Sequence, residues 1–289
     1  MIERSDITLP SRADDVHKYN CGKVAILAGS PGYTGAAVLT AQAAIRSGAG
    51  LVILAIPERL NPILEAKLTE VITQPYSTGE KDSLTLDSVN QLEKLLDWCD
   101  VLAIGPGLGR QDHTQIAIIK LLNHFSKPAV IDADALFALA NHMEDIFNTH
   151  HENWILTPHH GEFIRFIKNI SKEAFKQNIL DISSQFAKEK HINLLLKGAP
   201  SLAAAPNGQI YINPTGNSGL ASGGTGDVLT GITSSLLAQG LPPIEASYVA
   251  NYLHGLCGDE TIKSTSKMSL IAGDLIENLP LVLKNFFCG

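Results

Sequence analysis

A glycine-rich loop that ends in an aspartate is the strongest chemical signal in the sequence. Residues 213–227 contain five glycines in fifteen positions and lead directly into an apolar run, 228–238. The backbone N–H groups of such a loop, together with the positive end of a helix dipole, can hold an anion such as a phosphate group. We expect this anion hole to be formed by Gly223, Gly224, Thr225 and Gly226.

Asp227, the last residue of this loop, has two interpretations. It could be the N-cap of the following helix, a role in which Asp stabilises a helix by about 1 kcal/mol. A carboxylate beside an anion hole could also accept the proton of a hydroxyl that attacks a phosphoryl group. One residue can fill both roles, so both interpretations stay open.

Lys197 is the second candidate, because it follows the apolar run 192–196 and begins the segment Lys197–Ser201. A lysine at the end of a strand would bring a cation to the same edge of the sheet as the anion hole. The alternative is a lysine that points into solvent.

His159, His160 and Glu162 follow another apolar run, 154–156. A histidine at the end of a strand could contact a ligand. A metal site is a weaker interpretation, since no two histidines lie four apart on a helical face. The third interpretation is a pair of exposed histidines. His150, His151 and His254 have no motif around them and are interpreted as surface or packing residues.

Two further glycine-rich turns follow strand-like runs. Gly105–Gly109 has three glycines in five residues, which would let a ligand approach the backbone closely. Gly29–Ala37 matches neither the dinucleotide-binding pattern nor the Walker pattern, so a tight turn without a ligand is its alternative.

The elements that must position these loops alternate along the chain. Short apolar runs indicate buried strands and longer amphipathic runs indicate helices. Strands are expected over 23–28, 50–56, 101–104, 129–131, 154–156 and 192–196, and helices over 35–46, 86–96, 111–124, 135–140, 162–168, 172–190, 227–239, 243–258 and 268–278. Asn207-Gly208 between 201–205 and 209–212 predicts a hairpin.

This alternation predicts an α/β fold, a three-layer α/β/α sandwich with a mostly parallel central sheet. Residues 1–289 show no linker-like or repetitive segment, so we expect a single domain. In such sheets ligands bind beyond the carboxyl ends of the strands, which is where all the glycine-rich loops are expected.

Composition excludes several classes of protein. The chain has 289 residues, 45% of them hydrophobic, and a formal net charge of −7 with no basic block, which argues against a nucleic-acid partner. No apolar run approaches the roughly 18 residues that cross a bilayer, so no membrane association is expected. The four scattered cysteines and the lack of a secretory segment indicate reduced thiols and a cytoplasmic location.

Seven stretches in order along the chain resemble the ADP-dependent NAD(P)H-hydrate dehydratase family, of the YjeF C-terminal domain type, within the ribokinase-like superfamily. They are 32–37, 46–52, 103–109, 130–136, 156–159, 196–199 and 216–227. The resemblance implies that ADP and the S form of NADHX or NADPHX give AMP, phosphate and NADH or NADPH. It also implies Mg²⁺ as cofactor, with metal ligands that the sequence does not identify, and a homotetramer.

The resemblance also implies roles for single residues. Ala37, Gly107, His159 and Asp227 match positions that contact the hydrated cofactor, with Asp227 as the base. The positions that contact ADP or AMP are matched by Lys197, Gly198, Ala199, Pro200, Ser201 and Gly226. The chain departs from the family pattern at His160, where proline is usual, and at Ser201, where threonine is usual.

The family often carries an epimerase domain before this one. The first twenty residues leave no room for it here, so we expect epimerisation by a separate protein. Two other functions remain open: a small-molecule alcohol kinase of the hydroxyethylthiazole-kinase type, and a nucleotide-binding regulator without catalysis. The intact anion hole beside Asp227 argues against the regulator.

Overall fold

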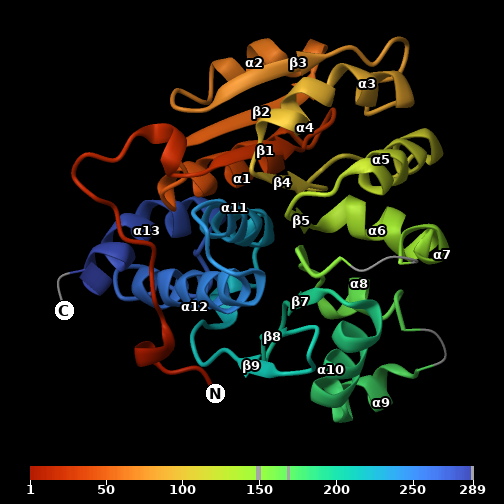
Figure 1. The fold of residues 1–289 in the computed structure, drawn as a ribbon. Helices are drawn as coiled ribbons and strands as arrows, with labels where there is room; N and C mark the ends of the chain where they lie inside the picture. Colours follow the sequence, from red (N-terminus) through yellow and green to blue (C-terminus); the bar gives the residue numbers. More distant parts are fainter. Residues whose placement is uncertain (148–150, 168–169, 288–289) are drawn as a thin grey trace.

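The computed structural model describes residues 1–147, 151–167 and 170–287, and within these ranges nine strands form one sheet (Figure 1). Its order is β3-β2-β1-β4-β5-β6-β7-β8-β9, parallel from β3 to β7 and antiparallel for β8 and β9. The strands are β1 Lys23–Leu27, β2 Leu51–Pro57, β3 Ile72–Tyr76, β4 Val101–Ile104, β5 Ala129–Ile131, β6 Trp154–Leu156, β7 Asn193–Leu196, β8 Leu202–Ala204 and β9 Ile210–Ile212.

The strand order reverses at β1. From β1 the chain runs outward to β2 and β3, and then returns to β4 on the other side of β1. The loops after β1 and β4 therefore diverge at neighbouring strand ends, which is the topological switch point where open α/β sheets bind ligands.

Helices cover both faces of the sheet, which confirms the three-layer α/β/α sandwich. Figure 1 shows α1, α11, α12 and α13 on one side and α5, α6, α8 and α10 on the other. The helices are α1 Thr34–Arg46, α2 Asn61–Glu65, α3 Leu86–Gln91, α4 Glu93–Trp98, α5 Asp112–His124, α6 Ala133–Asn141, α7 Met143–Ile146, α8 His160–Phe163, α9 Lys172–Gln177, α10 Ile179–Lys190, α11 Thr225–Ala238, α12 Pro243–Thr261 and α13 Ala272–Phe287.

Strand β5 illustrates why the central strands are apolar throughout. Val130 belongs to the buried cluster that also contains residues of α11, α12 and α13, whereas Ala129 and Ile131 belong to the buried cluster on the opposite face. Because successive side chains point to opposite faces, a strand covered on both sides must be apolar at every position.

Several boundaries differ from those predicted. The edge strand β3 was not expected, because Gln74 and Pro75 interrupt its apolar pattern, and proline is tolerated at a sheet edge. Each of the helices expected over 86–96 and 172–190 is broken in two, and the second break lies at Asn178. The hairpin around Asn207-Gly208 is confirmed.

Cys21, Cys99 and Cys257 are free and buried, while Cys288 and His150 lie outside the described residues. In the part of the chain that the structure describes, no helix has the length and apolar character needed to cross a membrane.

Candidate functional site

The loops predicted to carry chemistry meet at the carboxyl edge of the sheet. A parallel β-bridge joins His159, after β6, to Lys197, after β7, and the Lys197 N–H donates to the Pro158 carbonyl at 2.8 Å. This bridge continues the pairing of β6 and β7 beyond their regular ends at Leu156 and Leu196. It brings two of the predicted site residues side by side, although they are far apart in the sequence.

A cavity of about 920 Å³ opens at this edge, a volume within the range typical of sites for small molecules and cofactors. Its wall contains every residue predicted to contact ADP or AMP, together with His159 and Thr225 of the other predicted sets. The lining residues are His159, Lys197, Gly198, Ala199, Pro200, Ser201, Asn213, Pro214, Thr215, Gly216, Asn217, Ser218, Leu220, Ala221, Ser222, Thr225, Gly226, Leu229, Asn251, His254 and Gly255.

Lys197 is held by a buried ion pair rather than pointing into solvent. Its Nζ lies 2.7 Å from Asp132 Oδ1, and the Asp132 side chain is only 1% exposed. Thr230 Oγ1, on α11, donates to the other oxygen of Asp132 at 2.6 Å. A Cβ on Gly226 would lie 3.2 Å from Lys197 Nζ, so the ammonium group stands directly beside the first turn of α11.

The N-cap of α11 is Gly224, so the N-cap interpretation of Asp227 is wrong. Gly224 has φ +90°, a left-handed conformation that glycine adopts without strain, and a Cβ there would lie 2.5 Å from Leu39 Cδ1 of α1. Asp227 is instead the third residue of the helix. Within the described chain no side chain caps this helix end, which leaves it available to an anion.

The carboxyl group of Asp227 is strongly perturbed. Burial, reinforced by the negative charges of Asp132 and Asp134, raises its pKa from 3.8 to about 7, although Lys197 acts in the opposite direction. A carboxylate with a pKa near neutrality is a far better proton acceptor than an ordinary exposed one. Asp227 is not part of the cavity wall, but its neighbour Gly226 is.

His254 is a buried packing histidine, as interpreted, and it also lines the cavity. Its Nε2 donates to the Thr225 carbonyl at 2.9 Å, and burial lowers the pKa of His254 to about 4. The neutral ring therefore holds the carbonyl of Thr225, the first residue of α11, through this hydrogen bond.

Ala37 and Gly107 are both buried, and Gly107 lies against Ala36, the residue before Ala37. Ala37 is 0% exposed, and Gly107 is also buried, with a Cβ position 2.7 Å from Tyr33 Cβ and 3.3 Å from Ala36 Cβ. The Gly107 carbonyl accepts a hydrogen bond from Ser30 Oγ at 2.8 Å. Both residues are buried, and their contact with a hydrated cofactor stays a prediction.

His159 and Glu162 form a reciprocal cap at the start of α8. The Glu162 N–H donates to His159 Nδ1 at 3.1 Å, and the His159 N–H donates to Glu162 Oε2 at 2.9 Å. His160, in place of the usual proline, packs its ring edgewise against Phe175. Among the described residues no group of three or more His, Cys, Asp or Glu side chains could hold a metal ion, so the metal interpretation of these histidines has no support.

The loop after β9 is held on α12 by contacts that the sequence did not reveal. The Gly216 N–H donates to Asp259 Oδ2 at 2.8 Å, and Asn217 Nδ2 donates to Asp259 Oδ1 at 3.0 Å. Gly255 lets the loop lie directly on the helix, since a Cβ there would be 2.2 Å from Thr215 Oγ1. Gly255 and Gly258 lie three apart within α12, and glycines inside a helix can indicate that another segment packs closely against it. This pattern was the sequence signal for the contact between the loop and α12.

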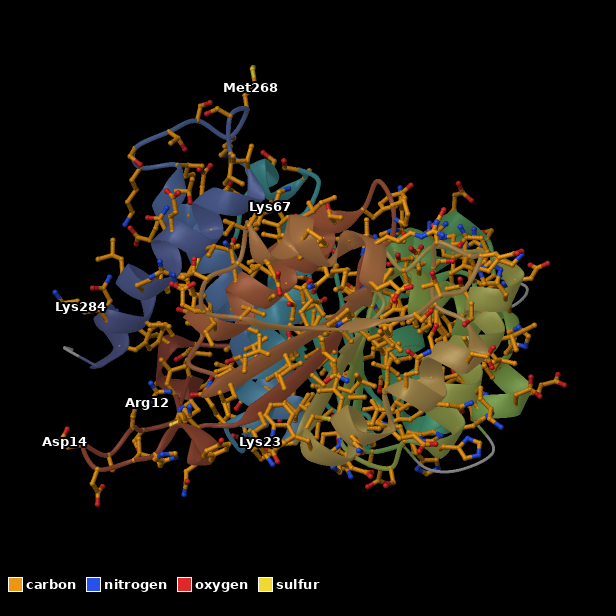
Figure 2. The ribbon with its side chains drawn as sticks, turned by 90° about the horizontal axis from the view of Figure 1, so that it is seen from above. Arg12, Asp14, Lys23, Lys67, Met268 and Lys284 are labelled. Atoms are coloured by element: carbon orange, nitrogen blue, oxygen red, sulfur yellow. The ribbon has the colours of Figure 1, made fainter. Side chains whose placement is uncertain are left out.

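The same loop also touches the connection between α12 and α13. A Cβ on Gly219 would lie 3.0 Å from the Lys267 carbonyl. The next residue, Met268, is 97% exposed, and Figure 2 shows it at the tip of a projection from the body of the molecule. The site therefore borders an exposed loop on this side.

A family model described as NAD(P)H-hydrate dehydratase matches residues 24–281. The chain belongs to the NAD(P)H-hydrate dehydratase family. A relative from Moorella thermoacetica, the bifunctional NAD(P)H-hydrate repair enzyme Nnr, is 43% identical over 96% of this chain and 52% of its own length. The chain thus spans about half the length of the curated relatives it matches.

Solved structures support the same assignment. The ADP/ATP-dependent NAD(P)H-hydrate dehydratase from Bacillus subtilis, co-crystallised with ATP and Mg²⁺, is 32% identical with a TM-score of 0.81, covering 96% of this chain and 95% of that one. A ribokinase from Thermotoga maritima matches with a TM-score of 0.55 at 16% identity, covering 91% of this chain and 100% of that one. The ribokinase-like fold of this member of the NAD(P)H-hydrate dehydratase family is therefore confirmed.

Proposed function

We propose that this chain catalyses the ADP-dependent dehydration of S-NADHX and S-NADPHX to NADH and NADPH, with release of AMP and phosphate. The observation that carries the proposal is the position of Asp227 in the first turn of α11. This carboxyl group, with a pKa raised to about 7, is adjacent to Gly226 in the wall of the cavity. The family membership of the chain supports the identity of the substrate.

In the first step Asp227 takes the proton of the C6 hydroxyl while that oxygen attacks the terminal phosphorus of ADP. The bond from this phosphorus to the bridging oxygen breaks, and AMP leaves. Negative charge on the transferring group is stabilised by the amides at the start of α11 and by Lys197, which lies beside Gly226.

In the second step phosphate departs, because the lone pair of the adjacent ring nitrogen expels it. Loss of a proton from the neighbouring carbon then restores the ring double bond. Hydroxide is a poor leaving group and phosphate is a good one, so a kinase-like step makes the dehydration feasible. The nucleotide's phosphoryl group leaves as inorganic phosphate.

Magnesium has to be considered together with the nucleotide. The part of the chain that the structure describes offers no cluster of three metal-ligating side chains. Mg²⁺ is commonly bound through substrate phosphates with one or two carboxylates. The donor set here fits only an ion that arrives with the phosphates of ADP, where it would neutralise their charge.

The test is an absorbance assay with purified protein, S-NADHX, Mg²⁺ and ADP. We expect the NADH band to recover, with one AMP and one phosphate formed per NADH. Asp227→Asn is the matched control and should bind ADP but lose turnover by about 10³-fold. If no NADH is recovered with ADP or ATP, while ATP-dependent phosphorylation of a thiazole alcohol occurs, the chain is a small-molecule kinase instead.

We also propose a functional link to an NAD(P)H-hydrate epimerase, since the relatives are named bifunctional repair enzymes. Such an activity would supply the S form that the dehydratase consumes. The homotetramer, the cytoplasmic location and the separate epimerase protein remain predictions.

A further inference from the structure

Two arginines lie against one aromatic ring near the carboxyl edge of the sheet. The guanidinium carbons of Arg110 and Arg165 are each 4.8 Å from the centre of the ring of Phe137, on α6. Arg110 belongs to the loop between β4 and α5, and Arg165 to the turn after α8. Because like charges repel each other, two cations that converge on one ring form a positive patch that attracts an anion.

Both guanidinium groups keep donors that are accessible to a ligand. Arg110 Nε donates to Asp134 Oδ1 at 2.7 Å, but the Arg110 side chain is 51% exposed and its two terminal nitrogens bind no other described residue. Arg165 is exposed, and within residues 1–147, 151–167 and 170–287 its guanidinium group makes neither a hydrogen bond nor an ion pair. The planar fork of N–H donors in a guanidinium group matches the oxygens of a phosphate group.

Each arginine follows a residue that is predicted to contact the hydrated cofactor. Arg110 lies three residues after Gly107, and Arg165 lies six residues after His159. Their loops follow β4 and β6, and the strand between these two, β5, leads into α6. Three neighbouring strands of the sheet thus bring both arginines and Phe137 together beside the predicted contacts.

Asp134 connects this positive patch to the proposed base. Its Oδ1 accepts from Arg110, and its Oδ2 accepts from the Gly109 N–H at 2.9 Å. The negative charge of Asp134 also contributes to the raised pKa of Asp227. Since such an interaction requires that the two carboxyl groups lie near each other, the patch is within the span of a dinucleotide whose hydrated ring contacts Asp227.

We propose that Arg110 and Arg165 bind a phosphate group of the hydrated cofactor. This inference rests on the proposed function, which supplies the hydrated dinucleotide as the ligand. The group is either the pyrophosphate, which NADHX and NADPHX share, or the additional phosphate of NADPHX. Both are the same chemistry, and the experiment separates them. A chain with a formal net charge of −7 needs such a local positive patch to hold an anionic substrate.

The test compares KM for S-NADHX and for S-NADPHX at pH 8 and saturating ADP. Arg165→Gln removes the charge but keeps a polar side chain, and it breaks no ion pair with a described residue. Because a charge-assisted contact with the substrate is lost, KM for at least one substrate should rise at least about tenfold. The kcat and the KM for ADP should stay within about twofold of wild type. Arg110→Gln should raise KM in the same pattern.

Arg4→Gln is the matched control. The guanidinium carbon of Arg4 lies 4.9 Å from the centre of the Phe286 ring, so it makes the same kind of contact, but between the N-terminal segment and α13. This control changes the net charge by the same amount as Arg165→Gln and should keep every KM within about twofold of wild type. An equal rise of KM in Arg4→Gln would mean that net charge rather than contact is responsible, and would overturn the inference.

The pattern of KM values identifies the phosphate group. A similar rise for both substrates assigns the arginines to the pyrophosphate, and a rise for S-NADPHX alone assigns them to its additional phosphate. KM values within about twofold of wild type for both substrates in either variant, or a rise only in the KM for ADP, would overturn the inference alone. A wild-type protein that converts neither substrate would overturn the proposed function as well, so the two failures are distinguishable.

Discussion

Asp227 combines two properties that are usually opposed, a negative charge and partial burial among other acids. Its carboxyl group stands near Asp132 and Asp134, and the pKa of Asp227 is raised to about 7 mainly by burial. At neutral pH it exists in both protonation states. The same feature that makes it a stronger base therefore makes activity and stability depend on pH.

The first prediction concerns the pH profile of catalysis. Because Asp227 must be ionised to accept a proton, kcat/KM for S-NADHX should rise about tenfold per pH unit below pH 7 and level off above it. Steady-state rates between pH 5 and 9 at saturating ADP would measure this. A profile that is flat between pH 5 and 8 would contradict the role of Asp227 as base.

The second prediction concerns stability. Between pH about 4 and 7 the folded chain binds a proton at Asp227 that the unfolded chain has released, so the free energy of unfolding falls as pH rises through this window. Asp227→Asn removes the buried charge. It should raise the free energy of unfolding by about 1–3 kcal/mol at pH 8 and much less at pH 5. Thermal unfolding of both proteins at pH 8 and at pH 5 measures this difference. Equal stabilisation by Asp227→Asn at the two pH values would contradict burial of the Asp227 charge as its cause.

The third prediction concerns the ion pair of Lys197 and Asp132. Lys197→Met would leave the Asp132 carboxylate buried without its cation, which should cost about 3 kcal/mol of stability and most of the affinity for ADP. The double variant Lys197→Met/Asp132→Asn should recover stability but not ADP binding. Chemical denaturation and calorimetry separate the two effects. Recovery of binding in the double variant would show that Lys197 acts only on the fold.

Among the elements, α12 supports the cavity in which we propose that ADP binds. Its residues Asn251, Gly255 and Asp259 lie four apart and so share one face, which carries the loop Asn213–Ser218. The contact is close because Gly255 has no side chain at the point where Thr215 crosses the helix. The helix α12, on one face of the sheet, thereby shapes the loop that follows β9, the last strand of the sheet.

The fourth prediction tests this contact. Gly255→Ala would place a Cβ 2.2 Å from Thr215 Oγ1 and 2.7 Å from the Thr215 carbonyl carbon, so the loop must move away. The Kd for ADP should rise at least about tenfold, with a loss of about 1–3 kcal/mol in stability. Gly273→Ala is the control, because its Cβ would meet nothing closer than 4.0 Å. Equal ADP binding by Gly255→Ala and wild type would contradict the supporting role of α12.

Across the whole molecule, α1 and α11 join the beginning and the end of the chain. Gly231 of α11 lies against α1, where a Cβ would be 2.3 Å from the Thr40 carbonyl and 2.7 Å from Ala43 Cβ. The same helices also meet at the start of α11, where a Cβ on Gly224 would lie 2.5 Å from Leu39 Cδ1 of α1. The geometry of the site therefore depends on a contact between distant parts of the sequence.

The fifth prediction follows from that packing. Gly231→Ala should separate α1 from α11 and cost about 1–3 kcal/mol, or about 2–4 °C in Tm for each kcal/mol. Gly35→Ala, also in a helix but with no atom within 4 Å of its Cβ, should leave Tm unchanged or slightly raised. Differential scanning calorimetry of both variants checks this. A Gly231→Ala protein as stable as wild type would mean that the helices can adjust without cost.

Most of the fold could be predicted because it depends on local patterns. Buried parallel strands are short apolar runs, glycine-rich turns mark their ends, and Asn-Gly specifies a hairpin. These preferences act within a few residues and are visible in the chain itself. The same reasoning selected Gly223–Gly226, Lys197 and Asp227 as candidate site residues, and their roles stay predictions. It missed β3, whose polar residues and proline are tolerated only because the strand lies at the edge.

The partners of the site residues could not be predicted, because they come from strands and helices that only folding brings together. Asp132 lies 65 residues before Lys197 and 98 before Thr230, yet it contacts both. The pairing of Asn213 with Asn251 likewise joins a loop and a helix. Spacing along the chain therefore indicated which residues are candidates for chemistry, whereas the tertiary structure determined which buried groups surround them and set their charge.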